Sequence, residues 1–247
     1  MRSVLTTILM GCFVLAGGVI YLGYYYPHLL DLSRPEVRDI AEIRARISPS
    51  IERRMAARGM KLGAPVYMRI FKEEHQLELW TETETGYELF RTYPICNYSG
   101  ELGPKLRQGD RQSPEGFYKV SKGSLNPNSS FHLSFNLGYP NRFDRAHGRT
   151  GDFLMVHGAC SSIGCYAMTD PLIEEIYVIA EAALNNGQAA FDVHAFPFRL
   201  SAQRLADAGK NKWHSFWTDM APAFTHFEAT RQIPKIAIRN KRYEVQI

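Results

Sequence analysis

The sequence predicts an α+β fold that is mainly β with flanking helices. Short segments rich in aromatic and β-branched residues recur through much of the chain, and such segments are typical of strands. Two longer stretches toward the C-terminus carry apolar residues at the spacing of an amphipathic helix. Hydrophobic residues make up 45% and charged residues 22% of the 247 residues, which is enough apolar material for one sizeable core.

The predicted strands follow one another in chain order. They are expected at residues 66–72, 76–80, 87–95, 117–121, 130–136 and 189–195, with a closing hairpin at 235–238 and 242–245. Asn126-Pro127-Asn128 has turn composition and is expected between the fourth and fifth strands. Two polar stretches, 97–115 and 139–151, are expected to be surface loops.

The clearest predicted helix covers residues 171–186. Leu172, Ile176 and Ile179 fall on one face of it, and Asp170 is expected as its N-cap because Pro171 suits the first helical position. A C-terminal helical part is expected at residues 201–208 and 212–231.

The first 26 residues have the character of a targeting segment. Arg2 supplies a positive charge and residues 4–26 contain no charged side chain, so the segment suits either a cleaved signal peptide or a membrane anchor. We favour the anchor. The remaining divisions are a helical linker at 27–63 that Pro49 interrupts, a central domain at 64–196 and a C-terminal extension at 197–247 packed on that domain.

The stretch after the second polar loop combines the features of a nucleophilic site. Its apolar start, 153–156, predicts a short buried strand that ends at His157-Gly158, and a loop of small residues then leads to Gly164-Cys165. This arrangement suits nucleophilic catalysis, because an imidazole at the strand end can take the thiol proton. The backbone N–H groups of Gly164 and Cys165 are candidates for stabilising an oxyanion.

The same stretch resembles the signature of the L,D-transpeptidase (YkuD-type) catalytic domain, a His-Gly strand end followed by Ser/Thr-His-Gly-Cys. Here His157-Gly158 precedes Ser162-Ile163-Gly164-Cys165, and the run His-Gly-x-Cys-x-Ser-Ile-Gly-Cys-Tyr-Ala-Met-Thr resembles the YafK branch. Further matching blocks lie in the same order from about Ala64 to the C-terminus. They include residues 65–67, 70–74, 98–105, 108–110, 113–118 and 144–148.

Two departures from the wider family affect the site. Ile163 stands where most members carry a second histidine, which removes a polar group beside the nucleophile. The loop between His157 and Cys165 is also shorter than usual, which predicts a more open site and a different acceptor preference.

The resemblance implies a β-sandwich with a helix after the catalytic cysteine, and an enzyme without a cofactor that acts on peptidoglycan stem peptides in the periplasm. Cys165 would attack the amide carbonyl at the L-centre of meso-diaminopimelate, His157 would carry the proton, and a thioacyl-enzyme would form. An amine acceptor gives L,D-transpeptidation, whereas water gives an amidase. For the YafK branch, the resemblance favours cleavage that releases a peptidoglycan-linked lipoprotein. Ser162, Gly158 and His147 are the expected substrate contacts.

His147 is the rival of His157 for the role of base. Its separation from Cys165 is closer to the usual family spacing, but it lies in a polar loop. His157 ends an apolar strand directly before Gly158, which is the context of the family base. We therefore assign His157 as the base and His147 as a substrate contact.

Other functions are less well supported by the sequence. A net charge of +4 with scattered basic residues and no recognised module disfavours nucleic-acid binding. A zinc set of Cys96, Cys160, Cys165 and His157 would lack a second tightly spaced pair. Cys96 and Cys160 are alternatively candidates for a disulfide in an oxidising compartment. A non-catalytic peptidoglycan-binding module that keeps the fold is the alternative to an enzyme.

The apolar run of residues 4–26 leads to a prediction about the mature protein. We expect this segment to be retained and to hold the protein at the inner membrane, facing the periplasm. Mass spectrometry of the mature N-terminus checks this. A mature chain that begins near Val19 would instead demonstrate a cleaved signal peptide.

Overall fold

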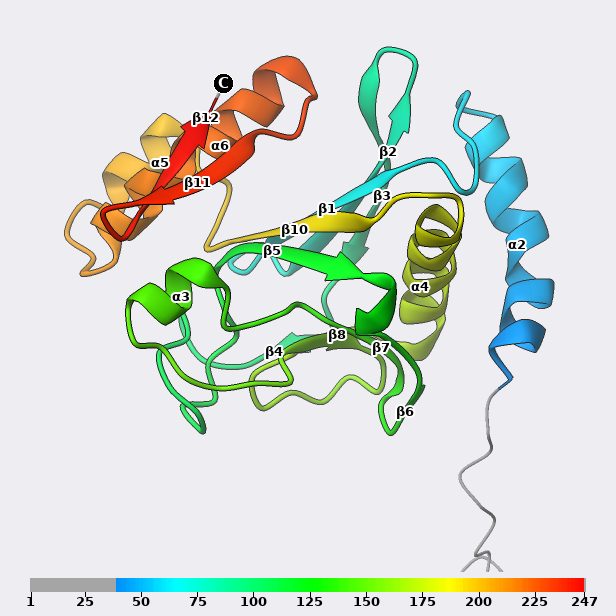
Figure 1. The fold of residues 1–247 in the computed structure, drawn as a ribbon, viewed down its shortest axis with the longest axis horizontal. Coiled ribbons are helices and arrows are strands. Elements are labelled where there is room, and N and C mark those ends of the chain that lie inside the picture. The colour runs from blue at the N-terminus through cyan, green and yellow to red at the C-terminus, as the bar shows by residue number, and fades with distance from the viewer. Residues whose placement is uncertain (1–38, 247) are drawn as a thin grey trace, which may run out of the picture. The chain divides into compact units, whose positions relative to one another are not determined.

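The structure is a computed structural model that describes residues 39–246, and it confirms the predicted α+β class. Two five-stranded sheets and a separate two-stranded hairpin are accompanied by helices in this part of the chain (Figure 1). The predicted targeting segment, 1–26, and the first part of the predicted linker lie outside the described residues. Among residues 39–246, no helix is both long and apolar enough to cross a bilayer.

Most strands begin and end within a few residues of the predicted positions. The strands are β1 (Val66–Phe71), β2 (Gln76–Thr83), β3 (Gly86–Pro94), β4 (Asn97–Tyr98), β5 (Gly116–Ser121), β6 (Leu125–Ser129), β7 (His132–Asn136), β8 (Met155–His157), β9 (Tyr166–Ala167), β10 (Ala190–Phe196), β11 (Lys235–Arg239) and β12 (Arg242–Gln246). The helices are α2 (Ile40–Ala56), α3 (Arg142–Ala146), α4 (Asp170–Asn185), α5 (Ala202–Asp207) and α6 (His214–Thr230), with a single 3-10 turn, η2 (Lys122–Ser124).

The two large sheets pack around one hydrophobic core. The first has the strand order β3-β2-β1-β10-β5 and the second β4-β9-β8-β7-β6. Phe135 of β7 and Phe191 of β10 meet edge to face between the sheets, with ring centroids 5.6 Å apart. Helix α4 contributes its predicted apolar face, including Ile176 and Ile179, to the same core. Burial of this shared apolar surface holds the sheets together.

Three predictions about loops and short strands were wrong. Helix α3 lies inside a predicted loop, where Asn141 and Asp144 form a capping box that starts the helix. The predicted turn at 126–128 is part of β6, where Pro127 is tolerated because β6 is an edge strand with a register shift. Phe153, expected in a buried strand, is 68% exposed and has a φ of 52°.

Helix α2 packs on α4 and is not interrupted at Pro49, contrary to our prediction. Its residues Ile43, Ile51 and Met55 are buried. Three ion pairs join the helices, Arg44–Glu181, Arg46–Glu174 and Arg54–Glu175. Packing on α4 therefore offsets the loss of the backbone hydrogen bond that Pro49 cannot donate within the helix. The predicted domain boundaries stay predictions, but the described residues, 39–246, belong to one compact unit.

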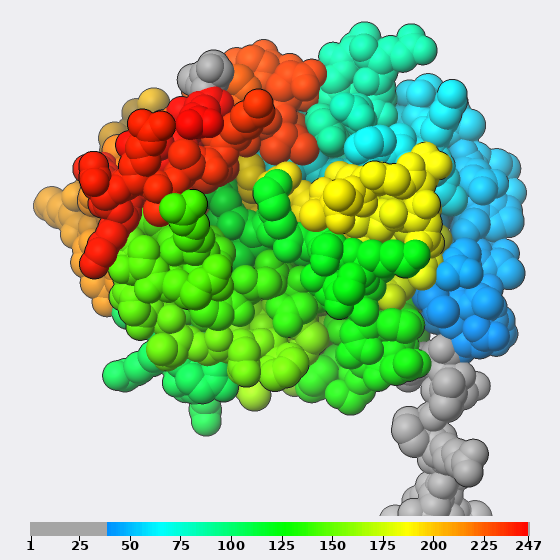
Figure 2. All heavy atoms as spheres, in the orientation of Figure 1, coloured from blue at the N-terminus to red at the C-terminus, as the bar shows by residue number. Residues whose placement is uncertain are grey.

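The C-terminal helices and the predicted hairpin, which is confirmed, form a second apolar cluster with the end of the first sheet. On the face shown in Figure 2, the hairpin lies beside α3 and β5. Tyr243 of β12 fixes this arrangement, because its ring stacks on Phe143 of α3 at 4.0 Å and meets Phe117 of β5 edge-on at 4.6 Å.

A fully buried ion pair links the first sheet to the polar loop that precedes β5. Lys72 Nζ, directly after β1, lies 3.1 Å from Glu115 Oε1, and both side chains are inaccessible to solvent. Lys72 also donates to the carbonyl oxygens of Gly103 and Ser113, and Glu115 accepts from Trp217 Nε1 of α6. Each charge has partners on several segments, which is the condition for burying it.

Removal of one charge from this pair should destabilise the protein strongly. Glu115→Gln leaves Lys72 buried without a carboxylate, and we expect a loss of about 3–5 kcal/mol in the free energy of unfolding, measured by urea denaturation. Glu73→Gln removes the partly exposed ion pair with Arg204 and serves as the control, with an expected loss of about 1 kcal/mol or less. Equal losses in the two variants would contradict this assignment.

Candidate active site

The predicted cysteine and histidine lie on neighbouring parallel strands. His157 ends β8, Cys165 immediately precedes β9, and the register pairs Val156 with Tyr166 and His157 with Ala167. Cys165 is thus two residues from the direct partner of His157. Because side chains alternate along a strand, this register favours the same face of the sheet for the two side chains. No direct hydrogen bond joins them within the described part of the chain; such contacts often tighten only when substrate binds.

The thiol of Cys165 is partly buried at the end of the loop that follows His157. Its Sγ accepts a hydrogen bond from the backbone N–H of Met155 at 3.4 Å and lies 3.6 Å from the carbonyl oxygen of Phe153. Burial raises the pKa of the Cys165 thiol, while the Met155 amide and the positive charge of Lys105 act in the opposite direction. The thiol is therefore protonated at neutral pH and requires a base to react.

The imidazole of His157 is oriented by the next residue in the chain. His157 Nδ1 donates to the carbonyl oxygen of Gly158 at 2.6 Å, which leaves Nε2 as the nitrogen that can accept a proton. The ring of Phe131 lies against the imidazole, with centroids 4.7 Å apart. Burial lowers the pKa of His157, opposed by its hydrogen bond to Gly158, so the imidazole is neutral at neutral pH.

Gly158 is buried, and no larger residue fits its position. An added Cβ would lie 2.5 Å from Asp170 Oδ1 and 2.9 Å from His132 Cβ. Asp170 does not cap α4 as predicted, because the N-cap is Thr169; its Oδ1 instead accepts a hydrogen bond from the backbone N–H of Ala159. The role of Gly158 as a substrate contact stays a prediction, and its carbonyl oxygen has the orienting contact described above.

Ser162 holds the loop that carries the cysteine. Its hydroxyl donates to the carbonyl oxygen of Cys165 at 2.8 Å and accepts from the N–H of Gly164 at 3.2 Å. Gly164 has a φ of 144°, a conformation that glycine adopts readily. Ser113 donates to the same Cys165 carbonyl at 2.9 Å, which ties this loop to the segment beside the buried ion pair. The Gly164 amide is thus occupied by Ser162 in the free protein.

Cys96 and Cys160 form a disulfide, with Cα atoms 5.3 Å apart. The pairing ties the loop after His157 to the segment before β4. It also uses two of the sulfurs that the zinc set would have required. Among the described residues, Cys165 is the free cysteine.

His147 lines a cavity to which neither Cys165 nor His157 contributes. It follows α3, where its Nδ1 donates to the carbonyl oxygen of Phe143 at 3.0 Å. Its cavity of about 620 Å³ is lined by Leu106, Arg107, Asp110, His147, Gly148, Arg149 and Trp213. The structure therefore brings His157, and not His147, to the strand beside the cysteine.

Comparison with known proteins gives the family. No protein-family model matches the chain. Over 184 residues it is 45% identical to an Escherichia coli K12 protein described as "Putative L,D-transpeptidase YafK", covering 74% of this chain and 75% of the relative, and the protein of the same description from strain O157:H7 matches equally. This chain belongs to the YafK-like L,D-transpeptidases.

Two solved structures are also similar. The helical cell shape determining protein Pgp2 from Campylobacter jejuni is 16% identical with a TM-score of 0.44, covering 77% of this chain and 80% of Pgp2. Bd1075 from Bdellovibrio bacteriovorus is 17% identical with a TM-score of 0.40, covering 72% of this chain and 78% of Bd1075.

Several residues around the site of this YafK-like protein were not found by sequence reasoning. Lys105 is buried and lies close enough to Cys165 for its charge to act on the thiol. Phe131 and Phe153 are exposed large apolar side chains of the kind found at binding surfaces, and Ile163, which the sequence had placed beside the cysteine, is exposed as well. No local signal marks Lys105, Phe131 or the exposure of Phe153, because these depend on how the two sheets pack.

Thiol alkylation distinguishes the two histidines of this YafK-like protein. We expect His157→Ala to move the pH profile of Cys165 alkylation to or above about pH 8.5, the ordinary range of an unassisted thiol, because burial already raises the pKa and the base is then gone. His157→Gln tests the same point with less loss of volume. His147→Ala is the control and should leave the profile unchanged. If only His147→Ala moves the profile, the assignment is reversed.

Proposed function

We propose that this YafK-like protein is a cysteine acyltransferase or amidase that acts on peptidoglycan stem peptides, with Cys165 as nucleophile and His157 as base. The observation that carries the proposal is the hydrogen bond from His157 Nδ1 to Gly158, which leaves Nε2 as a proton acceptor on the strand beside the cysteine. Family membership supports the same chemistry.

The reaction proceeds by general-base catalysis. Cys165 Sγ attacks the amide carbonyl carbon at the L-centre of meso-diaminopimelate while Nε2 of His157 takes the thiol proton. The tetrahedral intermediate collapses to a thioester, the C–N bond breaks, and the departing amine takes the proton from His157. An amine or water then attacks the thioester and regenerates the thiol. The N–H of Cys165 stabilises the oxyanion, joined by that of Gly164 once Ser162 releases it.

The exposure of the site favours water as the acceptor. Cys165 is only partly buried, and its neighbours Ile163 and Phe153 are 80% and 68% exposed, so solvent can reach a thioester at this sulfur. In the hydrolytic direction, the substrate is an amide between diaminopimelate and a lipoprotein, and cleavage releases the lipoprotein from peptidoglycan. The apolar side chains of Phe131, Phe153 and Ile163 then contact the polypeptide on the leaving side of the amide.

The cavity that contains His147 is the proposed subsite for stem-peptide carboxylates. Arg107 and Arg149 line it beside His147, and the hydrogen bond of Arg149 Nη1 to Asp144 leaves other guanidinium nitrogens as donors. The chain between Arg149 and Phe153 spans at most about 14 Å, so the subsite lies within reach of a short peptide bound at Cys165. Ser162 is the remaining proposed contact.

The proposed location is the periplasm, with residues 4–26 as an inner-membrane anchor. Two observations support export: the uncharged N-terminal run and the Cys96–Cys160 disulfide, since disulfides persist in oxidising compartments.

Digestion of purified sacculi tests the proposed activity. We expect the full-length protein in mild detergent to release diaminopimelate-linked products, identified by mass spectrometry, and Cys165→Ala to lower the rate by at least a hundredfold. Cys160→Ala removes the disulfide partner and is the matched control, with a loss of only a few-fold. Binding to sacculi without any release of products by the unmodified protein would instead indicate a non-catalytic peptidoglycan-binding module. Near-normal activity of Cys165→Ala would exclude Cys165 as the nucleophile.

The acidic limb of the rate profile tests the role of His157. Burial lowers the pKa of His157, so the neutral form that accepts the proton persists to lower pH than for an ordinary imidazole. We therefore expect activity to fall, on acidification, only below about pH 6.5. The measurement is kcat/KM against pH on soluble muropeptides; a midpoint clearly above that value would contradict the assignment.

A further inference from the structure

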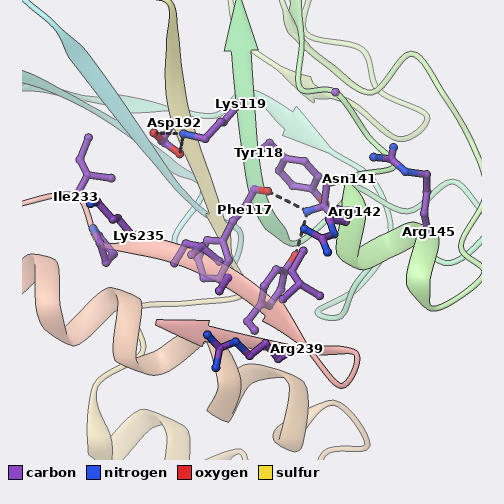
Figure 3. Close-up of a pocket in the computed structure, with 16 residues that line it drawn as sticks. Phe117, Tyr118, Lys119, Asn141, Arg142, Arg145, Asp192, Ile233, Lys235 and Arg239 are labelled. Carbon is purple, nitrogen blue, oxygen red and sulfur yellow. Dashed lines mark hydrogen bonds and ion pairs between the residues drawn. The ribbon is translucent and has the colours of Figure 1, made fainter. Parts of the chain in front are cut away.

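A large groove separates the first sheet from the C-terminal hairpin (Figure 3). Its volume is about 1030 Å³, and its lining comes from β5, from the α3 region and from β11. None of its lining residues is among those that contact Cys165 or His157. The groove is therefore separate from the candidate active site, and its ability to bind a ligand does not depend on the proposed function.

The groove lies between two open sheet edges. Strand β5 pairs with β10 on one side only, and β11 pairs with β12 on one side only. On β5, the carbonyl of Phe117 points away from β10 and accepts from Asn141 Nδ2 at 2.9 Å. The backbone groups of Lys119, two residues on, therefore also point outward, and its carbonyl oxygen lies beside Gly138.

The register of the hairpin gives the outward groups of β11. Asn240 and Lys241 both have positive φ, as in the tight two-residue turn that makes Arg239 and Arg242 a hydrogen-bonded pair. Because hydrogen-bonded and free positions alternate along an antiparallel strand, the backbone groups of Ile236 and Ile238 face away from β12. An extended peptide is the ligand whose backbone N–H and C=O groups match such edges.

The rim of the groove is strongly basic. Five basic side chains line it: Lys119, Arg142, Arg145, Lys235 and Arg239. Its one acidic side chain, Asp192, is held by Lys119 at 2.8 Å, as Figure 3 shows. Among the ion pairs of residues 39–246, none includes Arg142, Arg145 or Lys235, and all three side chains are exposed. The rim thus carries a positive charge that the protein itself does not neutralise.

Protection of edge strands does not account for this charge. Single lysines commonly guard an exposed edge against pairing with other chains. Here the basic residues come from three separate segments, α3 among them, and surround a hollow with an apolar floor that includes Phe117 and Ile236. Convergence of charge on a concave, partly apolar site is characteristic of a binding surface.

We propose that this groove binds an extended acidic segment of a partner protein, which adds as a strand to the open edges of β5 and β11. Main-chain hydrogen bonds to the N–H of Lys119 and to the backbone groups of Ile236 and Ile238 hold the segment, and its carboxylates pair with Arg142, Arg145 and Lys235. An anionic glycan has the charge but lacks the regular amide groups that two strand edges select.

The test uses a defined peptide and fluorescence anisotropy with the full-length protein. The probe is a labelled peptide about ten residues long with alternating glutamate and valine, compared with its lysine–valine counterpart. We expect the acidic peptide to bind and the basic one not to bind. The double variant Arg142→Glu/Lys235→Glu should weaken acidic-peptide binding at least about tenfold. Arg53→Glu/Lys61→Glu, which changes the same charge on exposed residues elsewhere, is the matched control and should have little effect.

A second arm tests strand addition itself. The same acidic peptide with alternate backbone nitrogens methylated keeps its charge but cannot pair with an edge, and we expect it to lose binding. The proposal is overturned if the unmodified peptide fails to bind at low ionic strength, or if the control variant weakens it equally. It is also overturned if the methylated peptide or a sulfated glycan binds as tightly as the unmodified peptide, which would indicate a general anion site.

Discussion

The active-site framework depends on one buried ion pair, Lys72 with Glu115. Neither charge can be buried alone, so β1, the polar loop before β5 and helix α6 must come together for both to be satisfied. Ser113, whose carbonyl oxygen accepts from Lys72, uses its hydroxyl to hold the carbonyl of Cys165. The position of the cysteine loop is thus coupled through two hydrogen bonds to the buried Lys72–Glu115 pair.

Burial favours the neutral forms of both the Cys165 thiol and the His157 imidazole. Burial raises the pKa of Cys165 and lowers that of His157, so a preformed thiolate–imidazolium pair is disfavoured. Backbone contacts position both groups: Met155 N–H on the sulfur and the Gly158 carbonyl on the imidazole. A neutral thiol is less prone to oxidation than a thiolate, which suits a partly exposed cysteine at the proposed periplasmic location.

The backbone on both sides of His157 contains residues in unfavourable conformations. Phe153, Ala159 and Cys160 all adopt positive φ, which is unfavourable for residues with side chains, and they flank the strand that ends at His157. The disulfide to Cys96 and the contact of Asp170 with Ala159 hold this segment in place. Local strain is therefore offset by long-range contacts, and the strained turn exposes Phe153 beside the cysteine.

The sequence by itself determined the features that depend on local periodicity and turn chemistry: most strands, the apolar face of α4, the hairpin at Asn240-Lys241 and the motif that contains His157 and Cys165. Only the tertiary structure decided which distant segments became neighbours. Helix α2 continues past Pro49 because it packs on α4, and Lys72 is buried because the polar loop before β5 folds over the end of β1. The disulfide was one of several alternatives until the fold placed its cysteines together. Burial and charge pairing are properties of such long-range contacts, and no local pattern encodes them.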